Sequence, residues 1–140
     1  MHQLPTHEVM RRSLAITHPG EDPSEHMRKA LVVMHRPDTH THQFGNSLFV
    51  VMDAGHRRGY LSLYNADTPR NLIQTIKEAR DWIYHKLGID FLVFDYVNPA
   101  IETLAHLLIT KHLVPQGALR TFNLDNGKTR AVLQLGPLRS

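Results

Sequence analysis

The chain has 140 residues, of which 41% are hydrophobic and 21% charged, and its formal net charge is +3. A chain of this length suits one domain with its own core, so we expect residues 1–140 to form a single domain. Cysteine is absent, which excludes disulfides, thiolate nucleophiles and Cys-type zinc sites. The basic residues are scattered along the chain, which argues against a committed nucleic-acid binder.

The sequence also argues against a membrane protein. No apolar run reaches the roughly 20 residues that a membrane-spanning helix needs. The N-terminal stretch MHQLPTHEVMRR lacks the apolar core of a signal peptide. We therefore expect a cytoplasmic protein, or a component of an assembly that is built in the cytoplasm.

The N-terminal part predicts a short strand at residues 2–4 and then two helices. Thr6 is placed to cap the first helix, which stops at His18-Pro19-Gly20. Asp22-Pro23-Ser24-Glu25 offers an N-cap, an N1 proline and an N3 acid for the second helix. Spacing of i, i+3, i+4 and i+7 places four apolar residues of that helix on one face: Met27, Ala30, Leu31 and Met34.

Strand patterns follow. His40–Phe44 indicates a short strand, Ser47–Asp53 (SLFVVMD) a buried strand and Tyr60–Tyr64 (YLSLY) a third. Residues 54–59 read as the turn of a hairpin between the last two.

The clearest helical pattern comes next. Asp67 or Thr68 is suited to the N-cap and Pro69 to the first helical position. Gly88 is a natural residue just beyond the C-terminus. The apolar stripe of this helix consists of Leu72, Ile76, Ala79, Ile83 and Leu87.

The C-terminal part completes the order of elements. Ile89–Val97 (IDFLVFDYV) is apolar on both faces apart from its aspartates, as expected of a central strand. Asn98-Pro99 opens a helix that extends through Leu113, and Asn126-Gly127 lies between two strand-like runs and predicts a hairpin. The order strand-helix-helix, three strands, helix, strand, helix, two strands predicts an α/β (α+β) fold.

This order resembles the GNAT N-acetyltransferase superfamily, over nearly the whole chain and best from Tyr60 to Leu135. The resemblance implies a mixed, mostly antiparallel sheet with helices on both faces. Asn98 matches the asparagine that often opens the helix after the central strand in that family.

The resemblance also implies a cofactor site. In the family two neighbouring strands, here Tyr60–Tyr64 and the strand within Ile89–Val97, splay apart and acetyl-CoA lies between them. If the chain is active, the acetyl-CoA site would comprise Leu61, Ser62, Leu63, Asn65, Arg70, Asn71 and Asn98. The group that deprotonates the amine would be Tyr64, Asp95 or Tyr96.

Two departures from the family predict that this site is closed. The family holds the diphosphate with a glycine-rich loop, whereas residues 65–70 (NADTPR) contain no glycine and Pro69 removes one N–H donor. Asp67 is expected to place a carboxylate about where a diphosphate would lie. The tyrosine that protonates the departing thiolate in many members is replaced by Ile109.

These departures favour a GNAT-like protein without acetyl transfer and without a cofactor. The chain also resembles the small acetyltransferase-like virion proteins of tailed phages in its length and its glycine-poor loop. The first hypothesis is therefore a binding or structural protein, a phage virion or assembly component, with other proteins as partners and a homo-oligomer left open. The alternative is an active acyl-CoA-dependent N-acyltransferase with an atypical phosphate loop.

Histidine is abundant, with 11 residues. His35, His40 and His42 lie close in sequence, and the last two would share a face of an extended strand. Because no carboxylate has an obvious third-ligand spacing, we expect a polar loop and no metal site.

Overall fold

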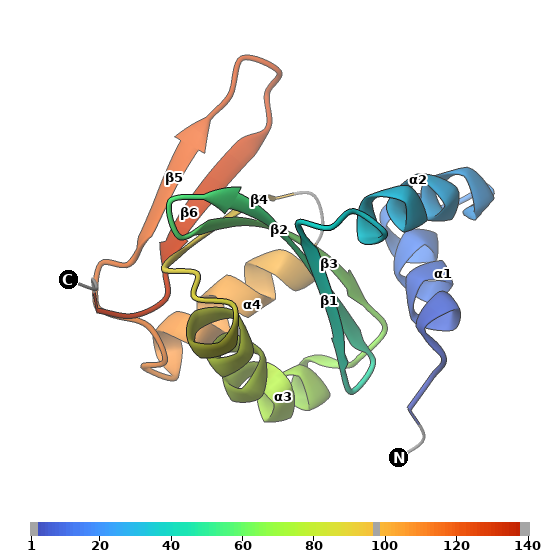
Figure 1. Cartoon of the computed structure of the whole chain (residues 1–140). Helices are drawn as coiled ribbons and strands as arrows, with labels where there is room; N and C mark the ends of the chain where they lie inside the picture. Colours follow the sequence, from blue (N-terminus) through green and yellow to red (C-terminus); the bar gives the residue numbers. More distant parts are fainter. Residues whose placement is uncertain (1–2, 97–98, 138–140) are drawn as a thin grey trace.

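The computed structural model describes residues 3–96 and 99–137 and shows one sheet with helices on both faces (Figure 1). The helices are α1 (Thr6–Thr17), α2 (Ser24–Met34), α3 (Pro69–Asp81) and α4 (Pro99–Thr110), and α3 continues into a π-helical turn, η1 (Trp82–Lys86). The strands are β1 (Thr39–Phe44), β2 (Ser47–Gly55), β3 (Arg58–Asn65), β4 (Phe91–Asp95), β5 (Leu119–Asn123) and β6 (Thr129–Gln134).

The sheet has six strands in the order β1-β2-β3-β4-β6-β5. Every neighbouring pair is antiparallel except β3 and β4, which run parallel. That parallel ladder has only three residue pairs, from Arg58–Phe91 to Tyr60–Val93. The mixed, mostly antiparallel sheet predicted from the sequence is confirmed.

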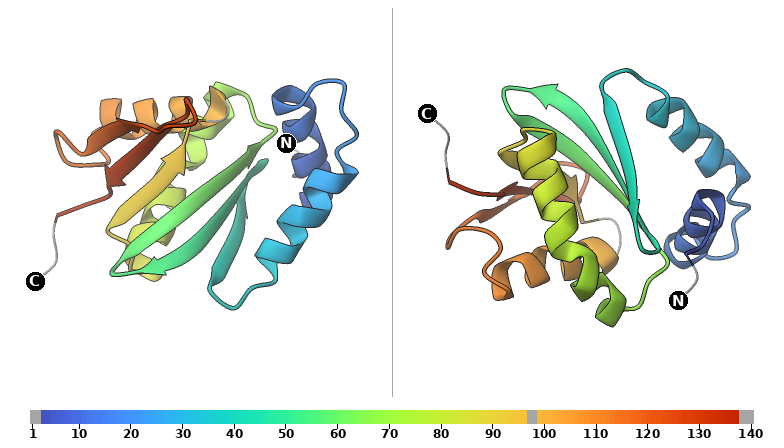
Figure 2. Two further views of the ribbon diagram at one scale, coloured as in Figure 1. Left: turned by 90° about the horizontal axis from the view of Figure 1, so that it is seen from above. Right: turned by 60° about the horizontal axis from the view of Figure 1, so that its bottom comes forward.

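The two faces of the sheet carry cores of different size. Helices α3 and α4 cover one face, where the larger core contains Phe49, Leu92 and Ile101 among its buried residues. Helices α1 and α2 lie on the opposite side (Figure 2), where the smaller core contains Val9, Met10, Leu48 and Val50. Helix α1 therefore holds its face of the sheet through far less apolar surface than α3 and α4 do.

Strand β3 shows how the pattern of its residues positions the site. Its side chains alternate between buried and exposed from Arg58 to Leu63. Leu61 and Leu63 join the larger core under α3 and α4, so Ser62 and Tyr64 face the α1–α2 side. A strand of this kind presents alternate residues to a site on one face while the others fix it to the core.

The N-terminal segment differs from the prediction. Residue 2 lies outside the described residues, and Gln3–Pro5 are not in a strand. The backbone of Leu4 is bonded to side chains: its N–H donates to Asn46 Oδ1 (2.8 Å) and its carbonyl accepts from Gln43 Nε2 (2.8 Å). These contacts satisfy the backbone groups that a strand partner would otherwise satisfy.

The start of α1 and one face of α2 also differ. Thr6 does not cap α1, because it is already inside the helix and its hydroxyl donates to Gln43 Oε1. In α2, which begins at Ser24, the N-cap residue is Pro23 and not the predicted Asp22, although Asp22 Oδ1 accepts from the N–H of Ser24 (3.0 Å). Leu31, predicted to face inward, is 44% exposed, because the smaller core reaches only the other three residues of the predicted face: Met27, Ala30 and Met34.

The remaining elements confirm the sequence patterns with small shifts in their bounds. The β2–β3 turn is shorter than predicted because His56 and Arg57 make it with positive φ angles of 54° and 60°. Thr68 caps α3, and Gly88 has a φ of +69°. Helix α4 ends at Thr110, before the predicted Leu113. Asn98, which was predicted to open this helix, lies outside the described part of the chain.

Gly59 permits the tight contact at the short β3–β4 ladder, so we expect Gly59→Ala to destabilise the fold. A Cβ atom there would lie 2.7 Å from Ile89 Cδ1 and 2.9 Å from Val51 Cγ1, both in buried side chains. Overpacking of this kind costs about 1–3 kcal/mol in the free energy of unfolding. Urea denaturation measures it; the exposed Ser62→Ala on the same strand serves as control, and equal midpoints for parent and Gly59→Ala would contradict the packing argument.

Candidate functional site

The central feature of the site is the divergence of β3 and β4. Their ladder stops at Tyr60 and Val93, while β3 runs on to Asn65 and β4 to Asp95. A pocket of about 540 Å³ lies at this point. We call it the β3–β4 pocket.

The β3–β4 pocket lies between the sheet and the two N-terminal helices. The sheet contributes β3 from Tyr60 to Tyr64 and β4 from Val93 to Asp95. The α1–α2 region contributes polar and apolar residues alike, among them Ser13, Thr17, His18, His26, Lys29 and Met34. Side chains therefore do not fill the gap between the strands, which is the arrangement that a closed site would have required.

Tyr64 lies in the wall of this pocket, as the sequence predicted. It is half-buried and packs against the smaller core beneath α1. Burial raises the pKa of its hydroxyl above the ordinary value of 10.0, because the phenolate would lose its hydration. Tyr64 is therefore protonated at neutral pH and is suited to donating a proton, while its role in deprotonating an amine stays a prediction.

Asp95 lies at the pocket edge of β4 and pairs with a residue that the sequence analysis did not identify. Arg130 of β6 donates to it from Nε (2.8 Å to Oδ1) and from Nη2 (3.4 Å to Oδ2). The hydrogen bond that Arg130 donates to Asp95 raises the pKa of Arg130. The guanidinium carbon of Arg130 also lies 5.8 Å from the centre of the Tyr60 ring. Asp95 thus has the partner that a carboxylate in a central strand requires.

Tyr96, the third predicted catalytic residue, does not line the β3–β4 pocket. Its ring centre lies 5.9 Å from that of Phe94, and it packs against the larger core on the other face of the sheet. Burial raises the pKa of its hydroxyl, and the charge of Glu102 adds to the increase. Successive residues of an extended chain point to opposite faces, so Tyr96, which follows Asp95, lies away from the pocket that Asp95 borders.

Asp67 is not where the sequence analysis expected it. Its Oδ2 accepts from the backbone N–H of Asn46 (2.9 Å) and from Ser47 Oγ (3.3 Å), so the carboxylate is turned toward the β1–β2 turn. Gly45 in that turn has a φ of +60°, and a Cβ there would lie 3.1 Å from Asp67 Oδ2. The carboxylate therefore holds the β1–β2 turn.

The N–H groups of the junction between β3 and α3, residues 65–71, are mostly engaged within the chain. Those of Ala66, Asp67 and Asn71 donate to Asn46 O, Asn65 Oδ1 and Thr68 Oγ1 respectively. Pro69 has no N–H. Among the described residues, only the N–H groups of Thr68 and Arg70 in this junction are without an acceptor. The sequence prediction that the junction lacks a phosphate-binding nest therefore agrees with the hydrogen bonds.

One predicted cofactor residue, Asn65, lies in the lining of a second, smaller pocket of about 160 Å³. Its lining includes Asn65, the start of α3 at Pro69 and the start of α4 at Pro99. It shares Ser13 and Thr17 with the β3–β4 pocket, so the two adjoin. Of the other predicted positions, Leu61, Ser62 and Leu63 line the larger pocket, Arg70 is exposed, Asn71 is half-buried, and Asn98 lies outside the described residues.

The histidines that suggested a metal site do not form one among the described residues. His42 stacks on Phe44 (4.3 Å between ring centres) and on Trp82 (5.5 Å), and His35 contacts the carbonyl of Leu31. Neither His40 nor His42 belongs to a group of three ligand atoms. A different group does come together, His18, Glu21 and His26, at the α1–α2 connection.

Comparison with solved structures decides the fold. A chimera of Vibrio cholerae spermidine N-acetyltransferase SpeG with hSSAT aligns with a TM-score of 0.55 and 11% identity, over 96% of this chain and 94% of the other. The SpeG complex with CoA and spermine gives 0.54 and 16%, over 96% and 94%. Campylobacter jejuni N-acetyltransferase PseH in complex with acetyl coenzyme A gives 0.53 and 14%, over 94% and 92%.

The chain has the GNAT fold. At these low identities the likeness shows the fold alone, and no protein-family model or curated protein matches the sequence. In the GNAT frame, the divergence of β3 and β4 is the splayed strand pair that the sequence analysis expected. Within the described part of the chain, no helix is long and apolar enough to cross a bilayer.

The residues that sequence reasoning missed come mainly from α1 and from β6. Ser13 is a polar residue but is only 4% exposed, because it lies on the buried helix face that also carries Val9, Met10 and Leu14. A serine within an otherwise apolar helix face was the one available signal that this face borders a pocket. Arg130 carried no such signal, since its pairing with Asp95 depends on the β4–β6 register.

We expect Asp67→Ala to destabilise the fold without opening a phosphate site. Loss of the carboxylate leaves the N–H of Asn46 without its acceptor, which costs about 1–3 kcal/mol in the free energy of unfolding. Urea denaturation compares it with Asp125→Ala, an exposed aspartate for which we expect a change within about 0.5 kcal/mol. Similar midpoints for both variants would mean that Asp67 does not hold the β1–β2 turn.

Proposed function

We propose that this GNAT-fold protein is an acyl-CoA-dependent N-acyltransferase that holds its acyl donor mainly through the arm of the cofactor. The observation that carries the proposal is the open β3–β4 pocket beyond the last ladder pair, Tyr60 and Val93. Its solved neighbours include N-acetyltransferases in complex with acetyl coenzyme A and with CoA and spermine.

The residues around the pocket fit the two ends of an acyl-CoA unequally. The backbone of β3 at Leu61 and Ser62 lies beyond the last β3–β4 ladder pair and borders the pocket. Its N–H and C=O groups there can pair with the amide groups in the extended arm of the acyl-CoA. The junction offers a diphosphate only the N–H groups of Thr68 and Arg70 and the exposed side chain of Arg70. We therefore expect weaker acyl-CoA binding than a glycine-rich loop would give.

Tyr64 has the position and the protonation state of a general acid. Its raised pKa keeps the hydroxyl protonated, and its side chain faces the pocket between β3 and α1. An acyl-CoA supplies an activated thioester, and the chain's task at the leaving sulfur is to return a proton. In this proposal Tyr64 protonates the departing thiolate, the role of the family's tyrosine that is replaced by Ile109 in this chain.

Asp95 is the remaining candidate to accept the proton of an attacking amine. Arg130 uses one lone pair on each carboxylate oxygen, and others remain for an amine or a bridging water. Apart from Asp95, the charged or titratable side chains of the lining are Lys29, the imidazoles of His18 and His26, and the two phenols Tyr60 and Tyr64. One carboxylate already paired with arginine is a poor match for a polycation, so we propose a monoamine acceptor rather than a polyamine.

We expect Tyr64→Phe to lower kcat for transfer by about 10²-fold, the usual loss on removing a general acid. Release of free thiol from acetyl-CoA in the presence of a panel of primary amines measures the rate. Tyr96→Phe is the matched control, since that hydroxyl does not line the pocket, and its rate should equal that of the parent.

The pH dependence gives an independent check on Tyr64. Because the pKa of Tyr64 is raised above 10.0, ionisation of this group should not reduce the rate between about pH 7 and 9. Thiol release by the parent with an equal rate in Tyr64→Phe would contradict the role of Tyr64 as general acid, but it would leave the proposed acyltransferase activity standing.

A second candidate function rests on the junction, where the N–H groups are satisfied internally. It is a GNAT frame without transfer activity that acts as a protein-binding component, such as a phage virion or assembly protein. Three exposed apolar residues on α1 and α2 are available for such contacts: Ile16 (65% exposed), Leu31 (44%) and Val32 (62%). The self-capped start of α3 favours it.

Calorimetric titration with acetyl-CoA separates the two candidates. The test variant is Thr68→Gly combined with Pro69→Gly, which releases the N–H of Asn71 from its cap and adds a donor at position 69. Measurable binding by the parent, tightened in the variant, supports the acyltransferase. No binding by the parent and binding by the variant supports the frame without transfer activity, and Asp125→Ala controls for non-specific effects.

A further inference from the structure

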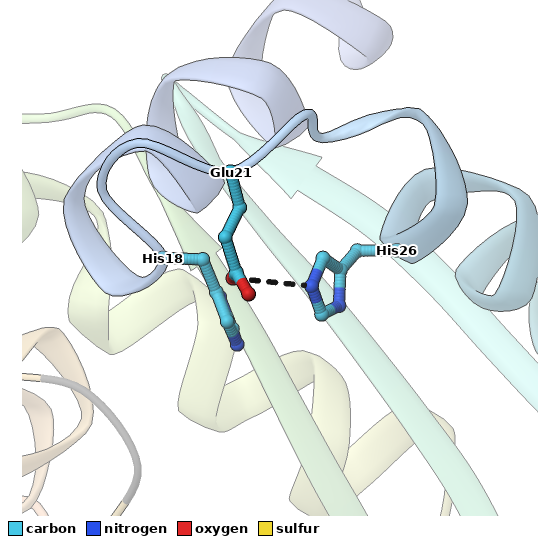
Figure 3. A group of neighbouring side chains, drawn as sticks. All are labelled: His18, Glu21 and His26. Atoms are coloured by element: carbon cyan, nitrogen blue, oxygen red, sulfur yellow. Dashed lines mark ion pairs between the residues drawn. The ribbon is translucent and has the colours of Figure 1, made fainter.

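The connection between α1 and α2 brings together three side chains that the site described above does not use. His18 follows the last residue of α1, Glu21 lies in the loop and His26 is in the first turn of α2 (Figure 3). One ligand atom from each lies within 4.8 Å of the others. The two imidazole rings are 4.1 Å apart, and Nε2 of His26 is 3.6 Å from Glu21 Oε2.

We propose that His18, Glu21 and His26 form a binding site for a divalent transition metal ion, with Zn²⁺ as the best match. Two imidazoles and one carboxylate are a donor set that suits this ion. The proposal is independent of acyl transfer. It also differs from the site first considered at His40 and His42, whose rings lie on another strand and find no third ligand among the described residues.

The hydrogen bonds of His18 prepare it for this role. The Thr17 hydroxyl oxygen lies 3.3 Å from the carbonyl oxygen of Ser13 and 2.9 Å from Nδ1 of His18. In the tautomer whose Nδ1–H donates to this hydroxyl, while the hydroxyl donates to Ser13, Nε2 of His18 carries a free lone pair. A ring nitrogen held by a hydrogen bond while the other binds the ion is the usual arrangement of metal-binding histidines.

The geometry requires only a modest contraction around the ion. Metal–ligand bonds of about 2.0–2.1 Å in a tetrahedral site place ligand atoms about 3.3 Å apart, against the 4.8 Å limit within which these atoms lie. Glu21 lies in the loop between the helices, where Gly20 has a φ of +80°, and its side chain is 58% exposed. The loop and the exposed carboxylate are the parts free to move toward the two rings.

The position of the site links it to the β3–β4 pocket. His18 and His26 both line that pocket, so the proposed metal site borders it. No described residue of α2 is fully buried, and α2 is held mainly by partial contacts with the smaller core. A bound ion would tie the start of α2 to the end of α1 and fix this side of the pocket.

Titration of the full chain with Zn²⁺ by calorimetry, repeated with Co²⁺ by absorption spectroscopy, tests the site. We expect one ion per chain, and at least about a 100-fold loss of affinity in His18→Ala/His26→Ala, because even outer partners of a metal site change affinity about 10–100-fold. Glu21→Gln should weaken binding about tenfold, and so should Thr17→Val, which keeps the shape of the side chain but removes the hydroxyl that orients His18.

The control removes the same number of histidines from elsewhere. His7→Ala/His106→Ala lacks two exposed histidines far from the site in sequence and should keep the parental affinity. Thermal unfolding without metal shows whether each variant is folded. Equal Zn²⁺ affinity in the parent and in His18→Ala/His26→Ala, or no binding by the parent, would overturn the proposal and leave Glu21 and His26 as an ordinary ion pair.

Discussion

The short parallel ladder between β3 and β4 is the constraint on which the site depends. Three residue pairs hold the two strands together, and Gly59 provides the close contact with Ile89 and Val51 at that point. Beyond Tyr60 and Val93 the strands must find other partners for their backbone groups or leave room for a ligand. The β3–β4 pocket lies there, and α1 and α2, which lie on that face of the sheet, form most of its opposite side.

The junction between β3 and α3 illustrates competition between stability and binding. Asn65, Asp67 and Thr68 each satisfy nearby backbone N–H groups, so the junction is held to the β1–β2 turn and to the start of α3. The same N–H groups would be the donors for a diphosphate in a glycine-rich loop. A junction that satisfies its own donors gains a stable turn and loses most of its capacity to bind an anion.

The two faces of the sheet differ in how completely they are packed. The larger core beneath α3 and α4 is continuous around Phe49 and Leu92, and Ile101 lies where this core borders the β3–β4 pocket. The smaller core is confined to residues near Val9 and Leu48, so polar and apolar side chains alike border the space under α1 and α2. The β3–β4 pocket and the proposed metal ligands therefore lie beside α1 and α2, where packing is least complete.

The extent of sequence-based prediction differs between fold and site. Elements whose pattern depends on local chemistry were predicted well: the cap at Thr68, the positive φ at Gly88 and the hairpin around Gly127. Tyr64 lines the pocket, in keeping with strand alternation, which is a local property. Tyr96 packs on the larger-core side, and the Asp67 carboxylate accepts from Asn46, far away in the sequence, so local pattern could not place either side chain.

By itself the sequence determined the order of helices and strands from α1 onward and the absence of a glycine-rich loop, since both follow from residue types and spacings along the chain, whereas the mixed sheet was implied by the family resemblance. Only the tertiary structure decided that the β3–β4 gap is open, that Arg130 pairs with Asp95, and that His18 and His26 come within reach of Glu21. Those facts depend on distances between segments that are remote in sequence or joined by a loop, and such distances are set by packing rather than by local preference.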